Sequence, residues 1–374
     1  ETSRSGYPAG WLQEDLIPNV SFGSTPVNSP SIGLSNTPYE NWNQIYSFTD
    51  NITKIWGNHT FKAGAYIEHT GKFATNQSGT SNLYRGTFDF GQNTNNPYNT
   101  GHGFGNTLLG EFNSYTESNS RTAGHFWFWN VESFVQDNWR LTRRLTLDIG
   151  VRFAYLTSLK DTNTSLAGFD PTTYSYANRP RMYFPALVGG KRVGVDPADA
   201  ARTVPAALIN FFVPNTGNPA NGMRVGGKDG YPSGMSTYKT PSISPRFGFA
   251  WDVLGNGKTA IRGGVGFFSD RPNTNETGEA LQGNPPLTFT PTLYYGNLAT
   301  FTSAAGYLSP SNVTFMWGDY KIPTTINYSF GIQQSVGFST VVEASYVGNV
   351  MRHNWWNRPI NSIALGARFD PKNF

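Results

Sequence analysis

The residues of this chain best suited to acid–base or metal chemistry are its histidines, because imidazole titrates near neutral pH and binds transition metals. The five histidines are far apart, and none shows the paired or i,i+4 spacing of metal ligands on one element: His59, His69, His102, His125 and His353. His69 follows Glu68 directly, but successive side chains of a strand point to opposite faces, so these two cannot form a catalytic pair. We interpret the histidines as loop or interfacial residues and expect no catalytic residue and no enzyme.

Two other patterns resemble ligand sites. Gly101-His-Gly-Phe-Gly105 has the glycines of a phosphate loop, but the sequence indicates no buried strand before it and no helix after it. It therefore predicts a flexible connection. Loop carboxylates could bind calcium, but the four candidates lack the spacing of an EF-hand loop: Asp170, Asp196, Asp199 and Asp229. We expect no metal and no cofactor, and the sequence identifies no substrate-binding residue.

Composition excludes several classes of protein. The 374 residues include no Cys, which excludes a disulfide scaffold, a thiolate metal site and a Cys nucleophile. No stretch approaches the roughly 18 consecutive apolar residues of a transmembrane helix, and the N-terminal stretch shows no signal-peptide pattern. The formal net charge is +4, and the densest basic cluster is only Arg140, Arg143 and Arg144, so we expect no nucleic-acid partner. Charged residues are 14% of the chain, about half the usual share of a soluble protein.

Period-two alternation is the strongest structural signal. In 146–155, apolar residues alternate with polar or small ones, which gives a strand one apolar and one polar face: Leu147, Ile149, Val151, Phe153 and Tyr155. The segment 127–139 repeats the pattern, and a turn at Arg140–Arg144 joins the two. Three further pairs of alternating segments surround short turns, within 46–68, 246–267 and 326–346. The chain is therefore predicted to be all-β and antiparallel.

Long segments join these four hairpins: 70–123, 159–242 and 271–323. The first should hold two more strands, near 83–91 and 108–119, which makes about ten strands and leaves 92–107 as a long connection on the short-turn side. Long alternating strands with short turns at one end and long loops at the other are typical of an outer-membrane β-barrel. The segment 159–242 is then a long extracellular loop. The alternative is a soluble β-sandwich or propeller, whose strands usually run about five or six residues.

Two features have both a functional and a structural interpretation. Asp196-Pro197 predicts a short helix through Phe212, with Asp at the N-cap and Pro at N1, which would form a ligand lid or a packed part of the loop. Tryptophans could form a girdle at the membrane interfaces or a platform for carbohydrate: Trp127, Trp129, Trp139, Trp251, Trp355 and Trp356. We favour the packed loop and, for the tryptophans on strands, the girdle; Trp355 and Trp356 remain open.

Several segments resemble the barrel signatures of TonB-dependent outer-membrane receptors. The longest runs from Glu132 to Arg152 (ESFVQDNWRLTRRLTLDIGVR). Others are 244–252 (SPRFGFAWD) with 257–264 (GKTAIRGG), 56–64 (WGNHTFKAG) and 342–348 (VEASYVG). The segments AALI at 206–209 and PANGM at 219–223 resemble a surface loop of the Oar-like subgroup. The resemblance covers roughly residues 12–358.

The resemblance implies a 22-stranded barrel with an N-terminal plug in its lumen and a TonB box before the plug. Oar-like members also carry an N-terminal carboxypeptidase-regulatory-like domain. Residues 1–374 show neither a plug nor a TonB box, so we interpret them as a partial outer-membrane β-barrel domain, an interior piece of a longer protein. We expect its open edges to need further strands or neighbouring copies, because unpaired N–H and C=O groups are costly in lipid.

The resemblance also implies a function and a location. The chain would lie in the cell outer membrane of a Gram-negative bacterium, in contact with lipid, as part of a receptor that passes a large solute. The TonB system would energise this passage through the plug, and iron chelates, cobalamin and glycans are the solute classes. The alternative is a structural protein, a barrel-derived fragment that forms an extracellular β assembly. Lipid around the apolar face would favour the receptor, and burial of that face by identical copies would favour the assembly.

Overall fold

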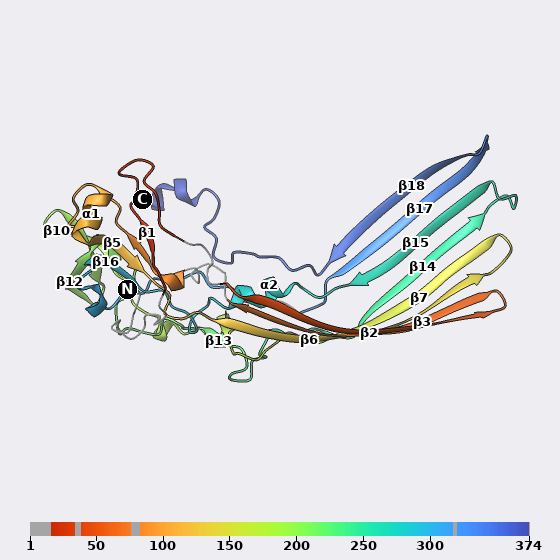
Figure 1. The fold of residues 1–374 in the computed structure, drawn as a ribbon, viewed down its shortest axis with the longest axis horizontal. Helices are drawn as coiled ribbons and strands as arrows, with labels where there is room; N and C mark the ends of the chain where they lie inside the picture. Colours follow the sequence, from red (N-terminus) through yellow and green to blue (C-terminus); the bar gives the residue numbers. More distant parts are fainter. Residues whose placement is uncertain (1–15, 34–38, 76–82, 317–319, 374) are drawn as a thin grey trace.

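A large antiparallel sheet dominates the computed structural model, which describes residues 16–33, 39–75, 83–316 and 320–373 (Figure 1). Eight long strands follow one another in chain order across it: β2 (Asn41–Trp56), β3 (His59–Thr75), β6 (Ala123–Arg140), β7 (Leu145–Leu156), β14 (Ser242–Asp252), β15 (Thr259–Ser269), β17 (Thr324–Gly337) and β18 (Thr340–Arg352). The short β8 (Lys160–Asp161) pairs with β6 and makes nine. Within the described residues, β2 and β18 are the two edges of this sheet.

Short turns join the strands at one end of the sheet, and the residues in them explain why. Gly57 has a φ of 58°, a value that glycine adopts without strain, and it turns β2 directly into β3. Between β14 and β15 the carboxylate of Asp252 accepts hydrogen bonds from the main-chain N–H groups of Gly255 and Gly257, each at 3.0 Å. Both of these glycines have a φ of 69°. The turns therefore fix the register of the hairpins that the alternation predicts.

The two extra strands expected within 70–123 do not belong to this sheet. β4 (Thr87–Asp89) and β5 (Glu111–Thr116) form a separate four-stranded sheet with β1 (Asn19–Ser21) and β16 (Thr292–Asn297). Side chains from these strands and their flanking segments pack into a local core: Phe88, Phe90, Phe112, Tyr115, Leu293 and Phe301. The large sheet thus has eight long strands where about ten were predicted. The long connection 92–107 was expected on the short-turn side of the sheet. It lies instead at the opposite end, because the whole segment between β3 and β6 starts and finishes there.

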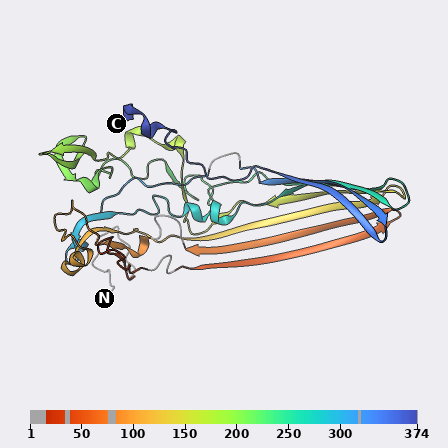
Figure 2. The ribbon, with the colours of Figure 1, turned by 90° about the horizontal axis from the view of Figure 1, so that it is seen from above.

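The long connections gather into one loop assembly at the end of the sheet opposite the short turns (Figures 1 and 2). It contains a three-stranded sheet of β10 (Phe184–Val188), β11 (Lys191–Asp196) and β12 (Asp199–Pro205), and a pair of β9 (Ala167–Phe169) and β13 (Met223–Val225). Its helices are α1 (Gly103–Leu109) and α2 (Thr274–Thr277). Short 3₁₀ turns complete the described chain: η2 (Pro171–Thr173), η3 (Tyr176–Asn178), η4 (Ala206–Leu208), η5 (Glu279–Leu281), η6 (Phe301–Ser303), η7 (Ala367–Phe369) and η8 (Pro371–Asn373).

Two local predictions for the loops are wrong. The helix expected over 196–212 is the end of β11, the strand β12 and the 3₁₀ turn η4. The carboxylate of Asp196 does accept a hydrogen bond two residues ahead, from the N–H of Ala198 at 3.0 Å, but this caps a hairpin turn, and the same carboxylate pairs with Arg181 at 2.9 Å. The glycine-rich stretch 101–105, expected to be a flexible connection, leads into α1 instead. That helix ends at Gly110 in the left-handed conformation.

A second apolar core joins the loop assembly to the sheet. It contains Phe126 of β6 together with loop residues that are all largely buried: Leu159, Leu166, Met235 and Leu281. No helix within the described parts of the chain is long and apolar enough to cross a membrane.

Candidate functional site on the inner face of the sheet

The register of the strands divides the large sheet into two chemically different faces. On one face, Ile67, Val131 and Tyr155 are paired neighbours on β3, β6 and β7, and all three are exposed. We call this the outer face. The opposite face carries Glu132 between Tyr66 and Ala154, and the loop assembly packs on it. We call it the inner face.

In the first half of the inner face, formed by β2, β3, β6 and β7, several polar side chains pair with one another across the strands. Glu132 pairs with Arg152 across β6 and β7. The carboxylate of Glu68 accepts hydrogen bonds from three side chains, namely Tyr66, Thr70 at 3.0 Å and Asn130 at 2.9 Å. Nearer the short turns, Gln136 donates to Asp148 at 2.7 Å. These cross-strand contacts make the first half a rigid polar wall, since satisfied networks in a partly buried site stabilise one arrangement.

A loop segment, residues 271–282, is anchored on this wall by Arg271. Its guanidinium donates to the carbonyl oxygens of Trp129, at 3.0 Å, and of Thr157, and to the amide oxygen of Asn130 at 2.8 Å. It also lies over the ring of Phe128, 4.0 Å from the centroid. Burial lowers the pKa of Arg271 to about 10, so the side chain is still a cation at neutral pH. The cation replaces its lost hydration by these carbonyl and ring contacts.

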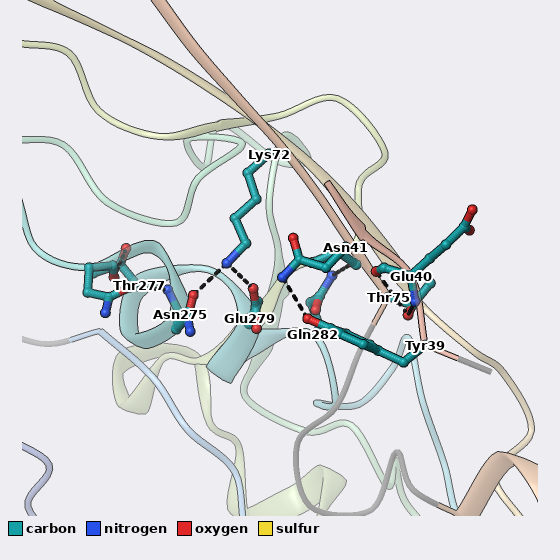
Figure 3. A network of polar contacts seen from close by, with 11 residues as sticks. Tyr39, Glu40, Asn41, Lys72, Thr75, Asn275, Thr277, Glu279 and Gln282 are labelled. Carbon is teal, nitrogen blue, oxygen red and sulfur yellow. Dashed lines mark hydrogen bonds and ion pairs between the residues drawn. The ribbon is translucent and has the colours of Figure 1, made fainter. Parts of the chain in front are cut away.

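A largely buried ion pair forms the second anchor of this segment (Figure 3). The ammonium of Lys72 on β3 lies 2.5 Å from the carboxylate of Glu279 and donates to the amide oxygen of Asn275, also at 2.5 Å. The side chains of Lys72 and Glu279 are only 10% and 12% exposed. Gln282 donates to the carbonyl oxygen of Ala74 at 3.1 Å. The segment therefore covers part of the inner face where the strands enter the loop assembly.

The second half of the inner face, formed by β14, β15, β17 and β18, is open instead. A groove of about 580 Å³ lies along these strands. Strand pairing places four of its lining residues in one cross-strand row: Arg246, Gly266, Asn327 and Asn349. Gly264 and Ser329 line the groove in the next row. Because Gly264 has no side chain and no neighbouring side chain covers it, main chain forms part of the groove floor there.

The histidines singled out in the sequence do not converge. The ring of His59 stacks on Trp139, with its Nδ1 2.7 Å from Asp137, and the ring of His69 stacks on Trp129 at 4.1 Å. Both histidines belong to the outer face. Within the described ranges, no group of three or more His, Asp or Glu residues could hold a metal ion. A membrane girdle remains a prediction for the tryptophans.

The four aspartates considered as calcium ligands are bound to groups of their own loops. Asp170 accepts hydrogen bonds from Thr172 and from the hydroxyl of Tyr231, and these lower its pKa. Asp196 pairs with Arg181, and Asp199 accepts from the N–H of Ala201 at 3.1 Å. Asp229, which is exposed, lies 4.0 Å from Arg224. Asp196 and Asp199 are cross-strand neighbours, but the structure does not bring all four together.

Sequence reasoning singled out none of the residues that shape the inner face. For Arg246 the signal was present, because the alternation of 246–253 places it opposite the apolar residues of its strand. Lys72 lies beyond the clearest part of the alternation of its strand, and Arg271 lies in a loop with no periodic pattern. The anchors could therefore be found only from the folded chain.

Comparison with known proteins identifies the class of this fold. The outer membrane beta barrel domain family matches residues 3–373. The outer membrane transporter YddB from Escherichia coli is similar at 13% identity and a TM-score of 0.39, over 82% of this chain and 25% of that one. The FrpB iron transporter from Neisseria meningitidis is similar at 10% identity and a TM-score of 0.25, over 85% of this chain and 47% of that one.

This chain therefore spans about a quarter of the YddB chain and less than half of the FrpB chain. A search of curated proteins finds no significant match. The prediction of an all-β outer-membrane fold is confirmed, since the family match extends over nearly every residue. The chain belongs to the outer membrane beta barrel domain family and is a protein of the outer membrane.

Proposed function

We propose that this chain is a wall segment of a TonB-dependent outer-membrane receptor, of the Oar-like subgroup, that passes a large polar solute. The observation that carries the proposal is the contrast between the two faces of the eight-stranded sheet. The outer face is apolar and exposed, whereas the inner face carries charged and amide side chains from β3 to β18. A polar face of this width suits the wall of an aqueous lumen.

The loop assembly supports the same proposal. In bacterial barrels the short turns are periplasmic and the long loops extracellular, so a solute from outside would meet the loop assembly first. The anchored segment 271–282 then lies at the entrance to the lumen, held on the wall by Lys72 and Arg271. The signature segments that resemble TonB-dependent receptors lie on the strands of the wall itself.

The energy source and the solute classes that we propose come from the resemblance to TonB-dependent receptors. The TonB system would act through a plug outside these residues, and the solute would be an iron chelate, cobalamin or a glycan. The chain would contribute no catalysis of its own, because the polar groups described above line a surface of the sheet.

Uptake in the living bacterium tests this function. Deletion of the gene should abolish growth on one solute class supplied as the only source of iron, cobalamin or carbon, and reintroduction of the gene should restore growth. Deletion of the energising TonB protein should cause the same loss. Growth that is unchanged on all three solute classes, or uptake that persists without TonB, would contradict the proposal.

A further inference from the structure

The groove on the second half of the inner face contains a cation that no carboxylate neutralises. Arg246 is exposed, and no ion pair involves it in the described part of the chain. The contact of its guanidinium is with the ring of Phe268, 4.9 Å from the centroid. None of the residues that line the groove is acidic. The groove can therefore bind an anionic group of a ligand.

We propose that this groove binds a carboxylate-bearing, hydroxyl-rich solute. The proposal rests on the proposed function, because it specifies the class of solute that the receptor passes. Arg246 would bind the carboxylate, since the planar guanidinium fork matches the two oxygens of a carboxylate. The aromatic ring of Phe268 contacts the guanidinium from one side, and Arg246 is itself a lining residue of the groove.

The polar lining residues other than Arg246 fit hydroxyl groups, whereas Phe268 and Val347 give the groove an apolar part. Asn327 and Asn349 lie in the same cross-strand row as Arg246, and Ser329 lies in the next row. Amides and hydroxyls both donate and accept hydrogen bonds, which is what sugar-like hydroxyl groups require. Only main-chain atoms lie within 4 Å of the side-chain position of Gly264, so a solute can approach the main chain there, whereas the ring of Phe268 covers Gly266. The volume, about 580 Å³, lies within the range typical of small-molecule sites.

Charged side chains on the first half of the inner face differ from Arg246 because they are paired within the protein. There, the cation of Arg152 is neutralised by Glu132, and Asp148 is bound by Gln136. In the second half, Glu343 of β18 accepts a hydrogen bond from Gln333 at 3.1 Å and does not line the groove. Among the described residues that line the groove, Arg246 is the only charged one, so a carboxylate in the groove would bind beside it.

Binding by the full-length protein in detergent, measured by titration calorimetry, tests the inference. Trigalacturonate and ferric citrate represent the two sources of this chemistry, an acidic glycan and a carboxylate iron chelate, and maltotriose is the neutral control. We expect one of the two acidic probes to bind and maltotriose not to bind. Arg246→Gln should weaken binding about tenfold or more, because a hydrogen bond to a charged group is lost. Asn327→Leu should weaken it as well.

Lys62→Gln is the matched control. Lys62 lies in the same cross-strand row as Arg246, three strands away and outside the groove, so its loss should leave binding unchanged. If Arg246→Gln does not fold, Asn327→Leu carries the test. Equal binding of maltotriose and the acidic probes, unchanged binding by both groove variants, or no binding of either acidic probe would overturn the inference. None of these results bears on the proposed function, which is decided by uptake in the cell.

Discussion

The two halves of the inner face share the same antiparallel strand arrangement but differ in how their polar side chains are paired. In the first half, Arg152 pairs with Glu132, and the ring of Phe134 lies over its cross-strand partner Gly64. In the second half, no ion pair is found for Arg246 within the described residues, and no side chain comes close to the open position of Gly264. Both halves follow the same alternation and the same antiparallel pairing.

The difference shows that one β wall can perform two tasks by choice of side chain alone. The first half supports the loop assembly, so its polar groups are partly buried and must find partners within the protein. In the second half, the polar side chains of Arg246, Asn327 and Asn349 are exposed, so they remain available to a ligand. We therefore expect substitutions in the first half to change stability and equivalent substitutions in the second half to leave it nearly unchanged.

The largest difference in stability between variants of the two halves should come from truncation of aromatic side chains. Phe126 on β6 is fully buried against Leu281 and other loop residues, whereas Phe268 on β15 is 40% exposed. Phe126→Ala should lower the free energy of unfolding by about 3–5 kcal/mol, because it leaves a cavity in the core. Phe268→Ala should lower it by only about 1 kcal/mol. Urea unfolding in detergent, followed by tryptophan fluorescence, measures both, and equal losses would contradict the division of the wall.

Removal of a cationic side chain should give the next largest difference in stability between the two halves. Lys72→Met leaves Glu279 as a largely buried, uncompensated charge and should lower the free energy of unfolding by about 3 kcal/mol. The double variant with Glu279→Met should recover most of this loss, since both charges are then absent. Arg262→Gln, on the second half, should change stability by less than about 0.5 kcal/mol. A single Lys72 variant as stable as the parent would show that the anchor contributes nothing.

Sequence reasoning found the large sheet because the features that specify it are local. Alternation and turn residues such as Gly57 and Asp252 act over a few positions, so they can be read without the rest of the fold. The strands β4 and β5 were assigned to the wrong sheet because their aromatic residues pack with β16, nearly two hundred residues later. A pattern within one segment contains no information about such a partner.

The inner face was predictable only in part, for the same reason. That Arg246 points away from the apolar face follows from the parity of its strand. That its cross-strand neighbours are Gly150 and Gly266, and that it forms no ion pair within the described residues, depends on the register of the strands. The prediction of a helix at 196–212 was wrong because an Asp can cap either a helix or a hairpin turn, and the local sequence does not distinguish the two. The ion pair of Asp196 with Arg181, which accompanies the hairpin, involves a residue from an earlier segment.

The smallest contrast should come from the glycines of the two halves. A methyl group at Gly64 would lie 2.6 Å from the ring of Phe134 and would also meet Asn51, whereas at Gly264 its nearest neighbour would be the carbonyl oxygen of Phe247 at 3.1 Å. Gly64→Ala should therefore lower the free energy of unfolding by about 1–3 kcal/mol, because the ring must move off the strand. Gly264→Ala should change it by less than about 1 kcal/mol, since alanine is also the better strand residue.

The same unfolding measurement compares the two glycine variants, and Gly64→Ala combined with Phe134→Ala is the control. If the ring is the cause, removing it should relieve most of the added strain, so that the two substitutions together destabilise by less than the sum of their separate effects. Additive effects, or a Gly264 variant as unstable as the Gly64 variant, would mean that close packing extends over the whole inner face. The second half would then have no open floor on which a solute could bind.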